Sequence, residues 1–331
     1  MTFEKPTRVV FMASDIIALP SLNWCAEHPM VELVGVITQP DRRSGRGKKL
    51  VPNPIKTWAQ EHHIEVKCPE RLSLEDAEWV RSLEVDISIV MAYGQFLKKS
   101  MLEAPIVDTV NLHGSILPAY RGACPVEASI LNGDPEAGVS LMRLVKKMDA
   151  GPVYDVEKVA IDGLPTGPEL RERVGGVCPR LLERALPLIV SSERGPVEQD
   201  PSSVSYVRRL FKTDAFIDFN NEAAAIERRS RALYPWPGTA IQVKGETLKL
   251  ADLKVVPGFD DQAPGTVLEI DGQIGIACAS GAIVPGQWQR PGGKMLASAD
   301  FFRGFSLELG TVIESVNNPP VISAAPYIYA S

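Results

Sequence analysis

Short apolar runs alternate with segments of helical periodicity along the first half of the chain. Residues 8–13 read RVVFMA and residues 86–91 read DISIVM, which is typical of buried strands. Strands that alternate with helices favour a parallel sheet covered on both faces. The pattern predicts an α/β fold with a Rossmann-like, open, mostly parallel sheet. The expected strands are residues 8–13, 32–38, 86–91, 109–113 and 138–144, and the expected helices are residues 15–28, 54–63, 73–83 and 125–132.

The pattern changes near residue 190. Residues 191–205 (SSERGPVEQDPSSVS) lose the apolar periodicity and are rich in Ser, Pro and acidic residues, which indicates a linker. Beyond the linker, short apolar runs are separated by glycines, which favours a small β-barrel. We expect an α/β domain at residues 1–190, a linker at 191–205 and a smaller, OB-like β-barrel domain at 206–331. The expected barrel strands are residues 241–243, 247–250, 265–270, 275–279 and 282–284.

Composition agrees with two ordinary globular domains. A chain of 331 residues is longer than a typical single core. The five cysteines are scattered and have no metal-ligand spacing, which indicates reduced thiols. No apolar run reaches the roughly 18 residues that a membrane helix needs. The sequence therefore predicts a cytoplasmic protein without a membrane anchor.

Candidate chemistry gathers in the stretch VNLHGSILPAYRGACP at residues 110–125. Alternate residues of a strand share a face, so Asn111, His113 and Ser115 are expected to project together at the strand end. A carboxamide and an imidazole suit the stabilisation of an oxyanion, and Asp149 in a later Gly-flanked loop is placed to hold the imidazole. The alternative is that Asn111 and Asp149 form turns and that His113 is a satisfied core residue.

A hydroxyl and a thiol near His113 are candidates for a covalent nucleophile. Ser115 and Cys124 lie close by, but neither has a second histidine in the sequence neighbourhood to activate it. Cys124 is expected to be a packed residue at a helix start. No His, Cys and carboxylate cluster has the spacing of a metal site, so no metal is predicted.

The joint pattern Asn111-Leu-His113-Gly-Ser115-Ile-Leu-Pro118 with a later Asp149-Ala-Gly resembles the active-site signature of folate-dependent formyltransferases. The resemblance covers about residues 8–310 and implies that Asn111, His113 and Asp149 are catalytic. It also implies a folate site with 10-formyltetrahydrofolate as formyl donor. The residues implied to line that site are Ser115, Ile116, Leu117 and Pro118, with Tyr93 and Gly94 from the run MAYGQFL on the pterin side. One departure is visible, because residues 11–18 (FMASDIIA) lack the Gly and Pro that the family has after its first strand.

A basic segment, DRRSGRGKK at residues 41–49, stands out in a chain whose net charge is −6. The overall acidity argues against indiscriminate nucleic-acid binding, whereas a local cluster of cations suits phosphate contacts. The alternative is a solvated charged loop. The sequence of this segment also resembles the loop insertion by which tRNA-directed members of the family hold the acceptor arm of the tRNA. The candidate tRNA-binding residues are Arg42, Arg43, Arg46, Lys48 and Lys49, with Arg42 first.

The second domain resembles the C-terminal barrel of the same tRNA-directed enzymes in its runs YPWPG (residues 234–238) and APGT (residues 263–266). The resemblance implies formyl transfer to the α-amino group of methionine on initiator tRNA, for translation initiation. A monomer is expected. A hydrolase or nucleotide-sugar formyltransferase is the main rival, and a catalytically idle RNA-binding protein is the other. The basic residues that could extend the expected tRNA track are Arg208, Arg209, Lys212, Arg229, Arg231, Arg290, Lys294 and Arg303, although for any single one a surface or ion-paired role is expected before a tRNA contact.

Overall fold

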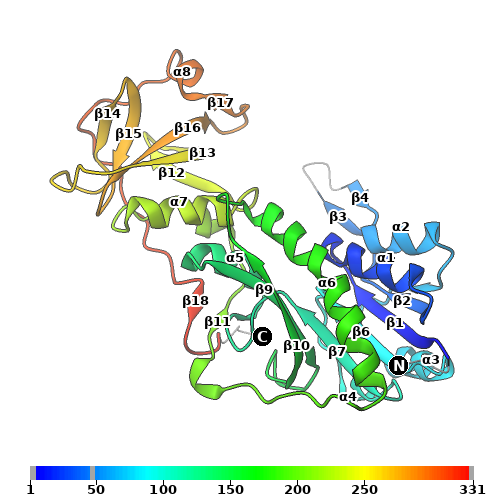
Figure 1. Ribbon diagram of the computed structural model, residues 1–331. Coiled ribbons are helices and arrows are strands. Elements are labelled where there is room, and N and C mark those ends of the chain that lie inside the picture. Colours follow the sequence, from blue (N-terminus) through cyan, green and yellow to red (C-terminus); the bar gives the residue numbers. More distant parts are fainter. Residues whose placement is uncertain (1–4, 45–48, 328–331) are drawn as a thin grey trace.

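A seven-stranded sheet forms the N-terminal half of the computed structural model, which describes residues 5–44 and 49–327 (Figure 1). The strand order is β10-β9-β7-β6-β1-β2-β5. The parallel strands are β1 (Thr7–Ala13), β2 (Val31–Ile37), β5 (Val66–Lys67), β6 (Ile87–Met91) and β7 (Asp108–His113). The antiparallel edge consists of β9 (Glu136–Arg143) and β10 (Val153–Ala160). The prediction of an open, mostly parallel α/β sheet is confirmed.

Helices cover both faces of this sheet, and the side chains of β1 show why its sequence is continuously apolar. Val9 and Phe11 pack into one core cluster, whereas Val10 and Met12 pack into another on the opposite face. Strands buried on both faces need apolar residues at every position. The first face is covered by α1 (Leu19–Glu27), α2 (Pro54–Glu61), α5 (Pro125–Asn132) and α6 (Gly167–Val190), and the second by α3 (Leu74–Ser82) and α4 (Lys99–Leu102).

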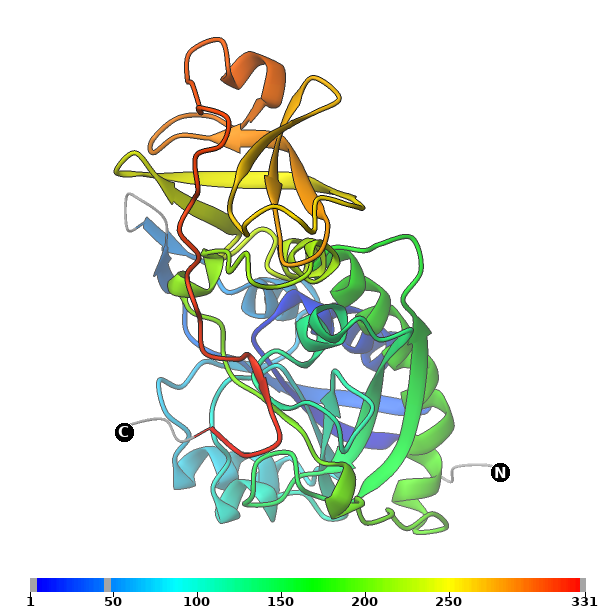
Figure 2. The same cartoon turned by 90° about the vertical axis from the view of Figure 1, so that its left-hand side faces the viewer.

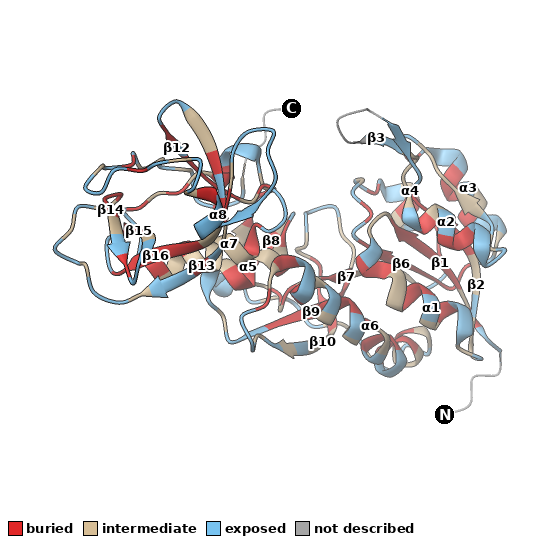
Figure 3. Cartoon of the chain, turned by 90° about the horizontal axis from the view of Figure 1, so that it is seen from above, coloured by how far each residue is buried: buried red, intermediate tan, exposed pale blue. Residues whose placement is uncertain are grey.

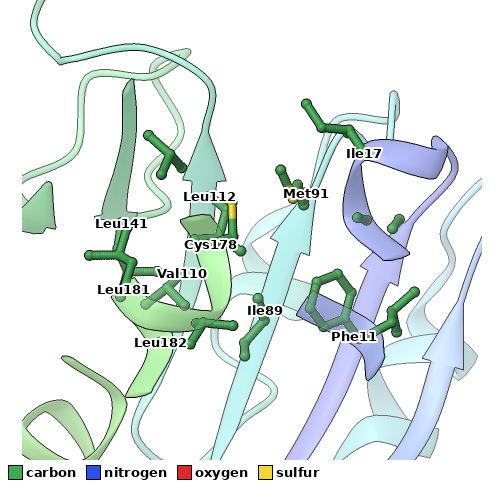
Figure 4. Close-up of a cluster of buried hydrophobic side chains, with 14 of the residues drawn as sticks. Phe11, Ile17, Ile89, Met91, Val110, Leu112, Leu141, Cys178, Leu181 and Leu182 are labelled. Atoms are coloured by element: carbon green, nitrogen blue, oxygen red, sulfur yellow. The ribbon is translucent and has the colours of Figure 1, made fainter. Parts of the chain in front are cut away.

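The long helix α6 was not expected from the sequence. Its interior holds Pro179 and Pro187, residues that normally interrupt helices. A Thr166–Glu169 capping box begins the helix, and one face packs Leu181 and Leu182 onto the sheet beside Val110 and Leu141 (Figure 4). Burial of that face compensates for the weak local propensity, since most helical stability in proteins comes from tertiary packing.

The C-terminal half is built around an antiparallel sheet with the order β12-β13-β16-β15-β14. Trp288 lies at the centre of its core with no exposed surface and stacks on Phe301. No pairing joins β14 back to β12 within the described part of the chain, so a closed, OB-like barrel is not confirmed. The elements are α7 (Ala223–Ala232), β12 (Thr239–Val243), β13 (Glu246–Val256), β14 (Val267–Ile270), β15 (Gln273–Ala277), β16 (Ala282–Gln289), β17 (Leu296–Ala297) and α8 (Ser298–Phe301).

Two chain segments connect the halves and meet in a small sheet. β11 (Tyr206–Val207) pairs in parallel with β8 (Arg121–Gly122) and antiparallel with β18 (Ile322–Ser323). The C-terminal segment, red in Figure 2, thus runs back from the second sheet to the N-terminal half. Buried residues follow the strands of both halves, and exposed residues cover the outer surfaces (Figure 3).

The short remaining elements complete the described chain. They are η1 (Ile16–Ala18), β3 (Arg42–Ser44), β4 (Lys49–Val51), η2 (Pro201–Ser203) and η3 (Lys212–Ala215). None of the helices in residues 5–44 and 49–327 is both long enough and apolar enough to span a lipid bilayer.

Candidate active site

The end of β7 places Asn111 and His113 on one face of the sheet. The His113 ring is only 6% exposed, and its Nε2 lies 3.0 Å from the carbonyl oxygen of Tyr120. Asn111 is partly exposed, and its carboxamide has no hydrogen-bond partner within the described residues. A buried imidazole is therefore fixed in place beside an amide group that is free to bind a ligand.

Asp149 reaches the same place from the loop between β9 and β10. Because β9 is antiparallel to β7, this loop begins beside Thr109, whose carbonyl accepts a 2.9 Å hydrogen bond from the Leu144 amide. The loop then extends until Asp149 Oδ2 lies 3.7 Å from His113 Nδ1 and accepts a 2.8 Å hydrogen bond from the Gly122 amide. The structure brings His113 and Asp149 together, although sequence reasoning left a simple turn aspartate open.

The two ring nitrogens of His113 face two different oxygen acceptors. Nε2 faces the Tyr120 carbonyl at 3.0 Å, and Nδ1 faces the Asp149 carboxylate at 3.7 Å. A neutral imidazole carries one N–H and the imidazolium carries two, so both nitrogens have an acceptor when the ring is charged. The pair has the composition of a general acid–base couple in which a carboxylate orients an imidazole.

The loop after β7 differs from the expected geometry at Ser115. The strand ends at His113, and the Ser115 amide donates to the His113 carbonyl at 2.8 Å, so the alternation of faces stops there. Ser115 has no exposed surface, and its hydroxyl donates to the Ala119 carbonyl at 2.6 Å. The prediction that Ser115 projects beside Asn111 and His113 is wrong. Its side chain shapes the loop from the inside.

The other predicted residues of this loop are held by Ser140 of β9. The Leu117 amide donates to Ser140 Oγ at 3.0 Å, and that hydroxyl donates in turn to the Ser115 carbonyl at 2.7 Å. Leu117 is buried, whereas Ile116 and Pro118 are partly exposed. Ile116 and Pro118 are therefore the members of this loop whose side chains can meet a ligand.

Neither the Ser115 hydroxyl nor the Cys124 thiol is placed to act as a covalent nucleophile. The Ser115 hydroxyl is buried and points to Ala119 rather than to His113. Cys124 is buried at the start of α5, its thiol donates to the Arg208 carbonyl, and burial raises the pKa of that thiol. A thiol of raised pKa is a poor nucleophile, in agreement with the packing role expected for Cys124.

Tyr93 and Gly94 follow β6 on the same rim, and three strand ends are joined there. The Tyr93 carbonyl accepts hydrogen bonds from Ser14 Oγ at 3.0 Å and from Gln39 Nε2 at 2.8 Å. The Tyr93 ring is buried, and its hydroxyl has no hydrogen-bond partner among the residues described. A ligand contact by the Tyr93 side chain is thus excluded in this conformation, whereas the backbone at Gly94 is exposed. Sequence reasoning missed Ser14 and Gln39, which nothing in their local sequence marks.

The basic segment after β2 forms a short hairpin. Arg42 lies on β3 with its side chain 62% exposed, 3.6 Å from Glu70 and within 3.2 Å of the Gln39 side chain. Arg43 and Lys49 are also exposed. The two remaining candidates, Arg46 and Lys48, lie outside the described residues. Exposed cations on a hairpin suit contact with phosphate groups.

Five of the eight basic residues named above for the second half form ion pairs with carboxylates. Arg208 is buried against Asp214 at 2.6 Å, and the same carboxylate lies 3.5 Å from Arg229. Arg208 is therefore unavailable to tRNA. The other pairs are Arg231 with Glu227, Arg290 with Glu246, and Arg303 with Asp300.

The segment expected to be a linker contributes an ordered strap to the site. Residues 197–205, called the strap below, begin with Val197, which forms a two-hydrogen-bond bridge with Val153 of β10. Its Gln199 side chain touches both Arg121 and the backbone of Asp149. Sequence reasoning missed Gln199, because a polar residue in a stretch without periodicity gives no signal of its partners.

No group of three or more His, Cys, Asp or Glu residues in the described ranges has the geometry to hold a metal ion. The five cysteines are free thiols, and four of them are buried.

Comparison with known proteins identifies the family. The profile of the formyl transferase family matches residues 8–186, and that of the formyl transferase C-terminal domain matches residues 209–306. A methionyl-tRNA formyltransferase of Acidiphilium cryptum is 38% identical over 311 residues, covering 92% of this chain and 99% of that protein. One from Methylococcus capsulatus is 34% identical and covers 92% of this chain and 100% of that protein. The chain belongs to the methionyl-tRNA formyltransferase family.

The fold extends to more distant formyltransferases. The N-formyltransferase from Helicobacter canadensis, solved in complex with folinic acid and dTDP-3-aminofucose, superposes with a TM-score of 0.62 at 19% identity, covering 86% of this chain and 100% of that chain. At this identity the likeness concerns the fold. Family membership makes the present protein an enzyme of formyl transfer, as the resemblance in its strand-end motif implied.

Proposed function

We propose that the protein transfers the formyl group of 10-formyltetrahydrofolate to the α-amino group of methionine esterified to initiator tRNA. The observation that carries the proposal is the approach of Asp149 to within 3.7 Å of His113, beside the unoccupied carboxamide of Asn111. Family membership supplies the type of reaction, and this geometry supplies groups of the required chemistry.

The proposed reaction passes through a tetrahedral intermediate. The amine nitrogen attacks the formyl carbon, and the carbonyl electron pair moves to oxygen. Asn111 and His113 are the proposed donors to that oxyanion, since donors in a buried site stabilise developing charge. The Asn111 carboxamide is available as it stands, whereas His113 would donate through Nε2 and exchange its contact with the Tyr120 carbonyl for one with the substrate. The C–N10 bond then breaks, N10 gains a proton, and the new amide nitrogen loses one. The His113 and Asp149 pair is proposed to move these protons.

The proposed folate site is the rim between the ends of β6 and β7. The exposed backbone around Gly94 and the partly exposed Ile116 and Pro118 support this placement. Ser115 and Leu117 are buried and are proposed to shape the loop. The folate enters as a substrate, the formyl donor.

The proposed tRNA contacts are the exposed cations of the β3–β4 hairpin, with Arg42 first. We also propose that the C-terminal half is an OB-like tRNA-binding domain, with domain limits at 1–190 and 206–331 and the connecting segment at 191–205. The free thiols of the described cysteines support a reducing, cytoplasmic compartment. A monomeric state stays a prediction of the sequence.

Formylation of charged initiator methionyl-tRNA by 10-formyltetrahydrofolate tests the proposal directly. A parallel reaction omits the tRNA, and another replaces it with uncharged tRNA. Formylmethionyl-tRNA that forms only with the charged tRNA is the expected result. Loss of the formyl group without tRNA would make the protein a hydrolase, and absence of turnover in all reactions would contradict the proposed acceptor.

A further inference from the structure

Asp149 sits in a left-handed backbone conformation in the loop after β9. Its φ is +48°, a left-handed value that is uncommon for residues other than glycine, and it lies outside any helix or strand. Two residues later, a Cβ on Gly151 would meet the Arg143 carbonyl oxygen at 1.9 Å, so the loop passes close to the end of β9. Aspartate tolerates this region in turns, and the contacts around the loop decide where its carboxylate lies.

The side chain of Gln199 provides such contacts from the strap. Its Nε2 donates to the Asp149 carbonyl at 2.9 Å and to the Gly151 carbonyl at 2.6 Å. Its Oε1 accepts from Arg121 Nε at 3.1 Å and from Arg121 Nη2 at 2.7 Å. A glutamine amide offers two donors and an oxygen with two lone pairs, so its hydrogen-bonding capacity is fully used here.

These bonds join the two loops that meet at His113. Arg121 belongs to β8, the short strand in the connection after β7, and is 5% exposed, without a carboxylate partner in the described chain. Asp149 belongs to the loop after β9. Gln199 therefore connects both loops through side-chain hydrogen bonds, at the place where Asp149 Oδ2 meets the Gly122 amide.

The strap itself is fixed at both ends, so Gln199 acts from a rigid base. Val197 and Val153 exchange two backbone hydrogen bonds of 2.8 Å. At the other end, Ser205 accepts from the Tyr120 amide through its hydroxyl at 2.9 Å and from the Arg121 amide through its carbonyl at 2.9 Å. A movement of the strap would shift both loops together.

We propose that Gln199 is a positioning residue that sets the placement of Asp149 against His113. The proposal rests on the proposed function of this pair. Gln199 is not expected to touch either substrate, because its amide group is already engaged by Arg121, Asp149 and Gly151. Gln199 acts on catalysis through the position of the Asp149 carboxylate. Small errors of geometry at reacting groups reduce rates strongly, so a displaced carboxylate should slow the reaction.

A double-mutant cycle on single-turnover formylation of charged tRNA tests this pathway. Q199A is expected to lower the rate by about tenfold, with less than about a twofold change in KM for the folate donor. In a D149N background the same change is expected to have an effect of less than about twofold, because the group that Gln199 positions is already lost. Equal losses in both backgrounds, or a wild-type rate in Q199A, would overturn the proposal.

Two further variants separate the contacts of Gln199. Q199E keeps the acceptor for Arg121 but faces the Asp149 and Gly151 carbonyls with an oxygen, so its rate should be no higher than that of Q199A. A wild-type rate in Q199E would mean that support of Arg121, not of Asp149, matters. E198A is the matched control, since Glu198 is the exposed neighbour of Gln199, and we expect the wild-type rate.

A measurement without substrate separates this inference from the proposed function. The Gly122 amide donates to Asp149 Oδ2, so its NMR proton shift reports the position of that carboxylate. The shift should move in the same direction in Q199A and D149N, and stay unchanged in E198A. An unchanged shift in Q199A would refute the positioning role even if the enzyme is active. Wild-type protein that forms no formylmethionyl-tRNA would instead contradict the proposed function.

Discussion

The rim at His113 and Asp149 and the β3–β4 hairpin hold charged groups in opposite surroundings. At the rim, His113 and Asp149 are 6% and 13% exposed, and both contact other chain segments. On the hairpin, Arg42 is 62% exposed and its ion-pair partner Glu70 is 73% exposed. The rim is a fixed arrangement of few groups, whereas the hairpin presents charge on long side chains in water.

This difference predicts two kinds of loss on mutation. Fixed, buried groups act at short range on the reacting atoms. Their loss should therefore lower the rate of the chemical step. Exposed cations act by attraction of phosphates that salt screens, so their loss should appear in the affinity for tRNA. Four substitutions test this division.

The largest effect is expected for D149N. The substituted amide cannot accept a proton or pair with the imidazolium, so the single-turnover rate should fall by about 10²- to 10⁴-fold. Folate affinity, measured by equilibrium binding, should change by less than about threefold. D162N is the control, since Asp162 is exposed and pairs with Arg173 away from the rim. Equal losses in rate and folate affinity would indicate a structural role for Asp149.

The second substitution, D214N, tests whether a buried charged residue outside the rim affects the rate of formyl transfer. Asp214 is 1% exposed and bonds Arg208 through both oxygens, at 2.6 and 2.7 Å. Removal of one partner of a buried ion pair typically costs about 3–5 kcal/mol of unfolding free energy. Urea unfolding should show a loss of that size, while the single-turnover rate of the folded variant stays near wild type. A large fall in that rate without a loss of stability would break the division.

The same carboxylate gives a pH dependence with a definite sign. Burial alone would raise the pKa of Asp214, but the hydrogen bonds from Arg208 and the Phe211 amide, with the charges of Arg208 and Arg229, lower it overall. The ionised Asp214 carboxylate therefore stabilises the fold above the pKa that it has in the unfolded protein, which is about 4. This stabilisation is lost as the pH falls through the lower pKa of Asp214 in the folded protein. Below about pH 4, the wild type should lose unfolding free energy more steeply than D214N.

The third effect concerns N111A, which removes an amide donor from the rim. Loss of one oxyanion donor typically lowers the rate by about 10²- to 10³-fold. KM for both substrates should change little, because the interaction strengthens in the transition state. N132A serves as a control, since Asn132 bonds Asp134 at the end of α5. A rate near wild type in N111A would remove Asn111 from the proposed mechanism.

The smallest effect is expected for R42A on the hairpin. KM for charged tRNA should rise by roughly 3- to 10-fold, and the slope of log KM against log salt should decrease by about 0.7 to 0.9 for one lost phosphate contact. The rate at saturating tRNA should be unchanged. K158A is the control, since it removes an exposed, ion-paired cation on the edge strand β10 of the first sheet, and its KM for tRNA should stay near wild type. A KM for tRNA that is flat with salt in the wild type would contradict the hairpin assignment.

Local sequence was sufficient for elements whose pattern is strong. The strands around Val9 and Ile89 were predicted because both faces are buried, and helix α3 because Ser73 and Asp76 form a capping box. Helix α6 was missed since Pro179 and Pro187 interrupt its pattern, and only packing against the sheet reveals it. Ser115 was misplaced because strand β7 ends two residues earlier than the alternation assumed.

The sequence by itself determined the family and the mostly parallel sheet, and its motif marked Asn111, His113 and Asp149 as candidates, because periodicity and motif spacing are properties of neighbouring residues. Only the tertiary structure decided that Asp149 faces His113 and that Tyr93 turns its ring into the core. It also placed Gln199 of an apparent linker between the two site loops. These contacts join segments far apart in the chain, and their geometry depends on how the sheet, the loops and the strap pack together.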